Sequence, residues 1–151
     1  MKIALISANT FTEPYPVYPL GLDYVAGALG DVHETSIIDM NCSESTSALT
    51  ARLRELSPDL VGLSLRNIDN TDAADSLGFI DHYRGIVGAI REATPAPVVL
   101  GGSGFTLFPK ELMEALEADY GVIGEGERIK LIMENPHTTN PSIILRGGTT
   151  G

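Results

Sequence analysis

Five short apolar runs alternate along the chain with segments whose apolar residues recur at helical spacing. The first run, KIALISA at residues 2–8, is almost continuously apolar, which is typical of a strand buried on both faces of a parallel sheet. The other four runs are bounded by turn-forming residues such as proline, glycine, serine and aspartate. The pattern predicts strands at residues 2–8, 35–40, 60–65, 98–100 and 120–123.

An amphipathic segment follows each of these strands. Residues 20–29 carry an apolar face between Pro19, which suits a first helical turn, and Gly30, which suits a helix end. Serine and threonine residues at 43–47 precede a leucine stripe that ends at Leu56. We expect helices at 20–29, 79–93, 109–116 and 128–134, and a further helix that starts within 43–47 and ends at Leu56. Long loops are expected at 9–19 and 66–76.

The regular alternation of strand and helix decides the fold class. Right-handed crossovers between parallel strands place helices on both faces of the sheet. We therefore predict an α/β, three-layer, Rossmann-like or flavodoxin-like domain over residues 1–134, with strand order 2-1-3-4-5. The polar tail at residues 135–151 has room for one edge strand and is too short to form a domain.

Composition narrows the class of protein without changing the predicted fold. The 151 residues are 43% hydrophobic, which is enough for a core, and the net charge of −10 argues against nucleic acid or a membrane surface as the partner. Cys42 is the one cysteine, so the chain cannot hold an iron–sulfur cluster, and a reducing cytoplasmic location fits best. No apolar run reaches the length of a signal-peptide core or a membrane span.

The most informative stretch runs from Val98 to Glu127. Two consecutive strands within it end in glycine clusters, GGSG at 101–104 and GEGE at 124–127. Parallel strands end at the same edge of a sheet, and open α/β folds bind their ligands at that carboxyl edge. Glycine there lets a large ligand approach the backbone without meeting a Cβ atom. The stretch therefore indicates one wall of a cofactor site.

Three common occupants of such an edge do not fit this sequence. A dinucleotide site needs G-x-G-x-x-G after the first strand, where SANTFTEP contains no glycine. A phosphate-accepting receiver domain needs acidic residues after the first strand and an aspartate at the end of the third, where Asn9 and Ser64 stand. A flavodoxin phosphate loop needs consecutive Ser, Thr or Gly residues, which Phe11, Pro14 and Pro16 interrupt.

Four sequence blocks in order resemble one family. They are YPLGLDYVAGAL at 18–29, SPDLVGLSL at 57–65, VVLGGSGF at 98–105 and GVIGEGE at 121–127. Together they are similar to the cobalamin-binding domain found N-terminal to radical SAM domains, and the resemblance covers roughly residues 1–130. In that family the corrin ring lies on the carboxyl edge of the sheet and the nucleotide tail runs down between strands and helices. The resemblance thus implies that the chain binds cobalamin.

The resemblance also implies which residues surround the cofactor. Ser64 and the glycines at 101–102 would line the tail, the second glycine cluster would lie beside the ring or tail, and the loop at 9–19 would face the ring. A corrin needs a broad, partly apolar platform, and its tail needs a narrow space walled by small residues. The expected cofactor-binding residues are Asn9, Thr10, Tyr18, Ser64, Arg66, Asn67, Gly101, Gly102, Gly104, Phe105, Gly124, Glu125 and Gly126.

One histidine lies in a segment that resembles an axial-ligand motif. Cobalamin-dependent methyltransferases and mutases carry D-x-H-x-x-G, and DVHETS at residues 31–36 matches it except at the last position. In that motif the histidine follows the first strand, whereas His33 follows the first helix and so falls at the opposite edge. We expect His33 to be a surface turn residue, and the cobalamin to have no axial ligand from the protein.

For the whole protein, the resemblance implies a radical SAM enzyme whose N-terminal module is this chain. The C-x3-C-x2-C cysteines that hold a 4Fe–4S cluster, and the S-adenosylmethionine site, would belong to a following domain reached through the tail at 135–151. This chain would present cobalamin for methyl transfer or a radical rearrangement without catalysing it. Two alternatives stay open: a cofactor-free docking or structural module, and a binder of another nucleotide-like ligand that uses Arg66 and residues 101–104.

Overall fold

A six-stranded sheet organises the part of the chain that the computed structural model describes, which is residues 2–7, 20–30, 33–39, 46–65, 73–102, 105, 109–124, 128–135 and 143–145. Its strands are β1 (Lys2–Ser7), β2 (Glu34–Asp39), β3 (Leu60–Ser64), β4 (Val98–Gly101), β5 (Tyr120–Val122) and β6 (Ile143–Leu145). They lie in the order β2-β1-β3-β4-β5-β6, with β1 to β5 parallel and β6 antiparallel to β5. The predicted order is confirmed, and the tail supplies the edge strand β6.

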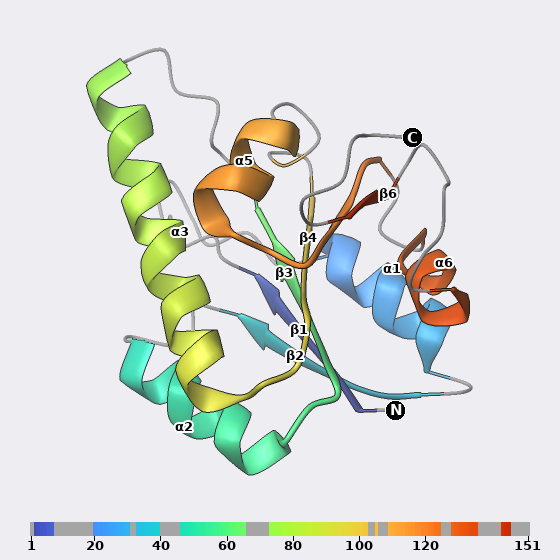
Figure 1. Ribbon diagram of the computed structural model, residues 1–151. Coiled ribbons are helices and arrows are strands. Elements are labelled where there is room, and N and C mark those ends of the chain that lie inside the picture. Colours follow the sequence, from blue (N-terminus) through green and yellow to red (C-terminus); the bar gives the residue numbers. More distant parts are fainter. Residues whose placement is uncertain are drawn as a thin grey trace.

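Helices cover both faces of the sheet, as Figure 1 shows. One apolar cluster joins the sheet to the helices on one face, and a second cluster joins it to those on the other. The first face carries α2 (Thr46–Leu56), α3 (Ala73–Ala93) and α5 (Pro109–Leu116), and the second carries α1 (Leu20–Leu29) and α6 (Ile129–Glu134). The predicted three-layer α/β fold is confirmed. Among these helices, none is long and apolar enough to cross a bilayer.

The third helix starts earlier than predicted. We expected a loop through Ser76 and a helix from Phe79, but α3 already begins at Ala73. Alanine has the highest helix propensity, and two alanines open this helix. The loop prediction is therefore wrong for residues 73–76, where the helix propensity of alanine outweighs the polar composition of the segment.

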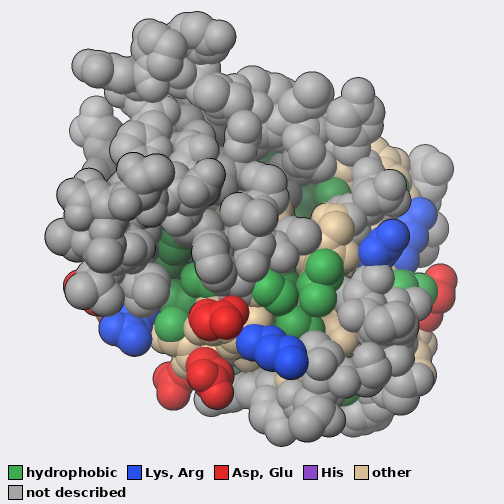
Figure 2. Space-filling model, turned by 90° about the horizontal axis from the view of Figure 1, so that it is seen from above, with side chains coloured by type: hydrophobic (Ala, Val, Ile, Leu, Met, Phe, Trp, Pro, Cys, Tyr) green, Lys and Arg blue, Asp and Glu red, His purple; other side chains and the backbone are tan. Residues whose placement is uncertain are grey.

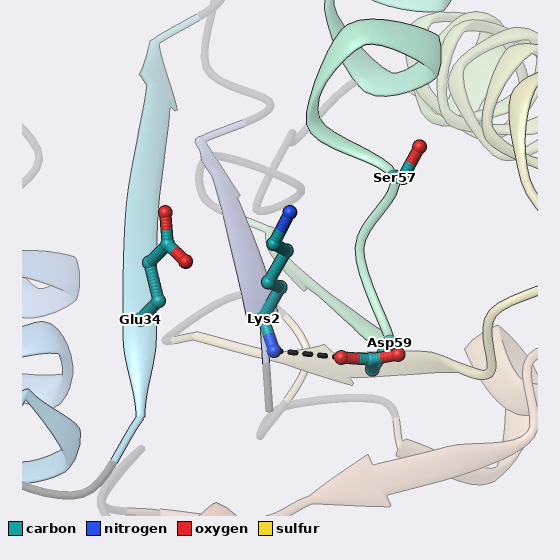
Figure 3. A pocket seen from close by; sticks show the side chains of 4 residues that line it. All are labelled: Lys2, Glu34, Ser57 and Asp59. Atoms are coloured by element: carbon teal, nitrogen blue, oxygen red, sulfur yellow. Dashed lines mark hydrogen bonds between the residues drawn. The ribbon is translucent and has the colours of Figure 1, made fainter.

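An aspartate fixes the register of β1 against β3 at the amino edge of the sheet. Oδ2 of Asp59 accepts a hydrogen bond from the backbone amide of Lys2 at 2.8 Å, and the Asp59 amide donates to the Lys2 carbonyl at 2.7 Å. Figure 3 shows the first of these contacts in an open hollow that Glu34 and Ser57 also line. Since Asp59 directly precedes β3 and Lys2 opens β1, the two bonds align the starts of both strands.

Asp119 repeats this arrangement between β4 and β5. Its Oδ2 accepts from the Val98 backbone amide at 2.9 Å, and its own amide donates to the Val98 carbonyl at 3.0 Å. The same oxygen accepts from Nη1 of Arg91 at 2.9 Å, in an ion pair with side chains 34% and 27% exposed. Arg91 also donates through Nη2 to the Glu117 carbonyl at 3.0 Å. One side chain of α3 therefore stabilises the junction of α5, β4 and β5.

The two edges of the sheet use left-handed backbone in different ways. At the amino edge, Ser57 after α2 and Glu117 after α5 have φ of 48° and 52°, and both residues are exposed. Among the described glycines, those with positive φ are Gly102 at 99° and Gly124 at 84°, and both follow strands at the carboxyl edge. Positive φ is thus adopted by residues with side chains at the amino edge and by glycines at the carboxyl edge.

Replacement of Asp119 by Ala should destabilise the domain. The change leaves the Val98 amide and the Arg91 guanidinium without their shared acceptor, so we expect a loss of about 1–3 kcal/mol in the free energy of unfolding. Urea unfolding followed by circular dichroism measures this. Asp81→Ala is the matched control, because Asp81 makes an exposed ion pair with Arg84 at 3.5 Å and should change the stability by less than about 0.5 kcal/mol. Equal losses in both variants would contradict the assignment.

Tyr83 gives the domain a measurable alkaline limit. Its side chain is 2% exposed, and burial raises its pKa from 10.0 to about 12. Because the pKa is higher in the folded state, this contribution to stability is complete below pH 10 and is lost as the pH rises towards 12. We expect the free energy of unfolding to fall over that interval, and to fall less in Tyr83→Phe. A tyrosinate absorbance titration in which all tyrosines ionise near pH 10 would rule this out.

Candidate functional site

The predicted cofactor-binding residues divide into two groups. Asn9, Thr10, Tyr18, Arg66, Asn67, Gly104, Glu125 and Gly126 lie outside the described residues. Ser64 and Gly101 are the last residues of β3 and β4, Gly102 follows β4, and Gly124 follows β5. The structure therefore brings these four to the carboxyl edge, whereas Phe105 is fully buried in the core.

Small residues end three neighbouring strands in a single row. The parallel register pairs Ser7 of β1 with Ser64 of β3, and Ser64 with Gly101 of β4. Apolar residues two or four positions earlier on each strand belong to the cluster under α1 and α6, so strand alternation turns all three towards that face. Ser7 is buried and Ser64 half-buried. The row places two serines and a glycine, and no large side chain of its own, at the ends of three neighbouring strands.

The adjacent glycines Gly101 and Gly102 lack a side chain for different reasons. A Cβ at Gly102 would lie 2.6 Å from the Leu65 carbonyl oxygen and 2.8 Å from Oγ of Ser64, so the protein itself excludes it. A Cβ at Gly101 would have its nearest contact at 3.8 Å, from the Val122 carbonyl oxygen. Because that is an ordinary van der Waals distance, packing among the described residues does not require glycine at 101. Among the described residues, no atom comes closer than 3.8 Å to a Cβ placed at Gly101.

Arg128 covers the glycine that follows β5. Its Nη1 donates to the Ile123 carbonyl at 3.3 Å and would lie 3.2 Å from a Cβ at Gly124. We predicted a helix from Arg128, but α6 begins one residue later, with Arg128 at its N-cap position. The guanidinium instead lies at the carboxyl edge of the sheet, in a chain with 20 acidic and 10 basic residues.

Phe105 packs on the opposite face of the sheet from the row of small residues. It is 0% exposed and belongs to the apolar cluster under α3 and α5. Its ring lies over Gly121 of β5, where the missing side chain leaves room for it, close to Met113 of α5. We expected Phe105 to line the cofactor; the structure places its ring in the core, and a contact with a ligand stays a prediction.

His33 lies at the amino edge, as predicted from element order. It precedes Glu34, whose partner across the sheet is Lys2 at the start of β1. Its backbone amide donates to the Leu29 carbonyl at 2.9 Å, which holds it against the end of α1. For that reason it is more buried than predicted, and its Nδ1 is buried without a hydrogen-bond partner among the described residues.

Two residues at the carboxyl edge were not predicted. Ser7 ends the first apolar strand, and its one local signal is a hydroxyl in a run that is otherwise apolar. Arg128 follows the GEGE cluster, and we expected it only as the first residue of a predicted helix. Neither sequence position shows that its side chain belongs to the edge; the register of β1 and the hydrogen bond to Ile123 do.

Seen from the carboxyl edge, the described surface has hydrophobic side chains near its middle and charged side chains towards its margin (Figure 2). Within the described ranges, no group of three or more His, Cys, Asp or Glu side chains is placed to hold a metal ion.

Comparison with known proteins identifies relatives that are much longer than this chain. Tryptophan 2-C-methyltransferase from Streptomyces laurentii is 34% identical over 130 residues, which are 84% of this chain and 21% of that protein. The structure of TsrM, a radical S-adenosylmethionine methyltransferase from Kitasatospora setae with cobalamin and a 4Fe-4S cluster bound, matches with a TM-score of 0.81 and 32% identity. That match covers 99% of this chain and 28% of TsrM, so the chain spans less than a third of either relative.

More distant solved structures share the fold. OxsB, a cobalamin-dependent S-adenosylmethionine radical enzyme, matches with a TM-score of 0.67 and 17% identity over 94% of this chain and 20% of its own. A cobalamin-binding protein from Desulfitobacterium hafniense DCB-2 matches with a TM-score of 0.60 and 16% identity, over 88% of this chain and 58% of its own. Both support the Rossmann-like architecture.

The family of the chain follows from a match over most of its length. The sequence model of the B12 binding domain covers residues 6–132, a range that includes the carboxyl ends of all five parallel strands and both glycine clusters. The resemblance drawn from the four sequence blocks is confirmed, and with it cobalamin as the cofactor of the family. The chain belongs to the B12-binding domain family.

Proposed function

We propose that this chain binds cobalamin at the carboxyl edge of its sheet and presents it to a radical SAM domain that performs methyl transfer. The observation that carries the proposal is the row formed by Ser7, Ser64 and Gly101, in which three neighbouring strands end in small residues. The two methyltransferase relatives support the reaction class. When bound, cobalamin supplies a cobalt centre able to carry a methyl group, while the protein supplies binding and orientation.

The residues of the row suit the nucleotide tail of the cofactor. Gly101 leaves space in which a flat base can approach the backbone, and the hydroxyls of Ser7 and Ser64 can each donate and accept hydrogen bonds. The Leu65 amide donates to the Gly101 carbonyl at 2.8 Å, which extends the β3–β4 pairing beyond the strand end. This wall is therefore rigid before a ligand arrives. Arg128 adds a positive charge that favours the phosphate of the tail.

We further propose that the protein contributes no axial ligand to the cobalt. His33 occupies the one segment of this chain that resembles an axial-ligand motif, and it lies at the amino edge, a full strand length from Ser64 and Gly101. To reach a cobalt ion at the carboxyl edge, the side chain of His33 would have to span the whole length of the strands.

The domain arrangement is also a proposal. Residues 1–134 would form the cobalamin module and residues 135–151 would lead into the radical SAM domain, whose 4Fe–4S cluster and S-adenosylmethionine site lie outside this chain. The small share of each relative that the chain covers supports this arrangement. Residues 143–145 of the tail are also part of the sheet, as β6.

Cobalamin retention tests the main proposal. The purified chain is mixed with hydroxocobalamin, the free cofactor is removed by gel filtration, and the visible spectrum is recorded. We expect retained cofactor with a base-off spectrum. Gly101→Val should weaken binding by about tenfold or more, because the side chain fills the ligand's space, while the melting temperature is maintained.

Gly88→Ala is the matched control for this substitution. Gly88 is an exposed glycine of α3 whose Cβ would meet nothing within 4 Å, so both binding and folding should be maintained. A wild-type chain that retains no colour would favour the cofactor-free docking module instead. If Gly101→Val binds cobalamin with wild-type affinity, the row formed by Ser7, Ser64 and Gly101 is not part of the binding site.

A second prediction concerns the axial ligand. His33→Ala should leave cobalamin affinity, the visible spectrum and the electron paramagnetic resonance spectrum of the reduced cofactor unchanged, because the side chain lies at the opposite edge. A nitrogen hyperfine splitting in the wild-type spectrum that disappears in His33→Ala would contradict the proposal and assign the axial position to this histidine.

A further inference from the structure

We infer that Phe105 is a positioning residue: its ring, seated on Gly121, anchors the segment that carries the glycines of the cofactor wall. The inference rests on the proposed function, since the wall is where we propose that cobalamin binds. It adds a role for two residues that lie on the far face of the sheet from the row of small residues.

The fit between Phe105 and Gly121 is close. A Cβ at Gly121 would collide with Cζ of the ring, and would lie 2.9 Å from Cε1 and 3.1 Å from Sδ of Met113. Gly121 is in the middle of β5, where glycine normally weakens a strand, and its φ is not in the left-handed region. The ring of Phe105 therefore accounts for glycine at this position, and the ring itself is 0% exposed.

Two described residues between β4 and α5 have close neighbours in the fold. Gly102 is enclosed by the backbone of Leu65 and by Oγ of Ser64, and Phe105 is enclosed by Gly121 and Met113. Three peptide units join Gly102 to Phe105, so their Cα atoms cannot be more than about 11 Å apart. A displacement of the ring is transmitted over this short distance to the glycines at the carboxyl edge.

Helix α5 cannot easily take up such a displacement. Arg84 of α3 donates through Nε to the Ala115 carbonyl at 3.1 Å, and Arg91 donates through Nη2 to the Glu117 carbonyl at 3.0 Å. These bonds hold the carboxyl-terminal end of α5, while Phe105 lies before its amino-terminal end. Added volume at Gly121 must therefore move the ring and the residues next to it, and not the whole helix.

The test is a double-mutant cycle at these two positions. Gly121→Ala should displace the ring, and Phe105→Leu should leave a gap over Gly121; each should weaken cobalamin binding by about tenfold. In Phe105→Leu/Gly121→Ala the smaller side chain makes room for the added methyl, so affinity should return towards that of the wild type. Affinity is measured by titration of the visible spectrum.

Hydrogen exchange of the cofactor-free chain gives a second readout. Peptides that contain Gly102 and Phe105 should exchange faster in each single variant, and at nearly the wild-type rate in the double variant. Leu53→Ala is the control: this buried residue of α2 should lower the melting temperature while affinity and exchange at Gly102 stay unchanged. Should Gly121→Ala not fold, Phe105→Leu and the double variant still test the anchor.

The outcomes separate this inference from the proposed function. If the wild type binds cobalamin but the double variant is no better than either single one, or Leu53→Ala weakens binding as strongly, the anchor is wrong and the proposed function stands. If neither the wild type nor any variant binds cobalamin, yet exchange at Gly102 follows the expected order, the proposed function is wrong and the anchor stands.

Discussion

The paired hydrogen bonds of Asp59 and Asp119 at the amino edge are the constraint on which the candidate site depends. Each aspartate joins the residue before one strand to the first residue of its neighbour. Side chains alternate along a strand. If β3 slipped by one residue against β1, a leucine would therefore occupy the position of Ser64. The alignment of Ser7 with Ser64 is therefore fixed by contacts made one strand length away from the cofactor edge.

Hydrophobic periodicity predicted the sheet order and the position of every described strand in the parallel part. It also predicted that Ser64 and Gly101 lie at the carboxyl edge, where the structure has them, while their contact with a cofactor stays a prediction. It could not predict Ser7, since a single serine after an apolar run has no meaning until the register places it beside Ser64. Arg128 was missed for a related reason: its side chain turns back to Ile123, and helical pattern carries no information on that direction.

Phe105 shows how far a local motif can be followed. Its place in the GGSGF block indicated a cofactor contact, because neighbouring residues of the block do reach the carboxyl edge. Its burial depends on Gly121, a residue of a different strand, and no spacing rule connects the two. The early start of α3 is a simpler case, since the helix propensity of Ala73 is a local property of the sequence. Tertiary contacts determine where the Phe105 side chain lies, whereas local helix propensity determines where α3 begins.

The left-handed residues at the two edges impose different rules on sequence change. Ser57 and Glu117 are exposed and accept a side chain in this conformation, whereas Gly102 has backbone atoms where a side chain would have to lie. Ser57 and Glu117 themselves can therefore be replaced without touching Gly102, provided that Asp59 and Asp119, which hold the register of the strands, are kept. A fluorophore or an immobilising linker attached at Ser57 would report on the domain while leaving the opposite face unobstructed.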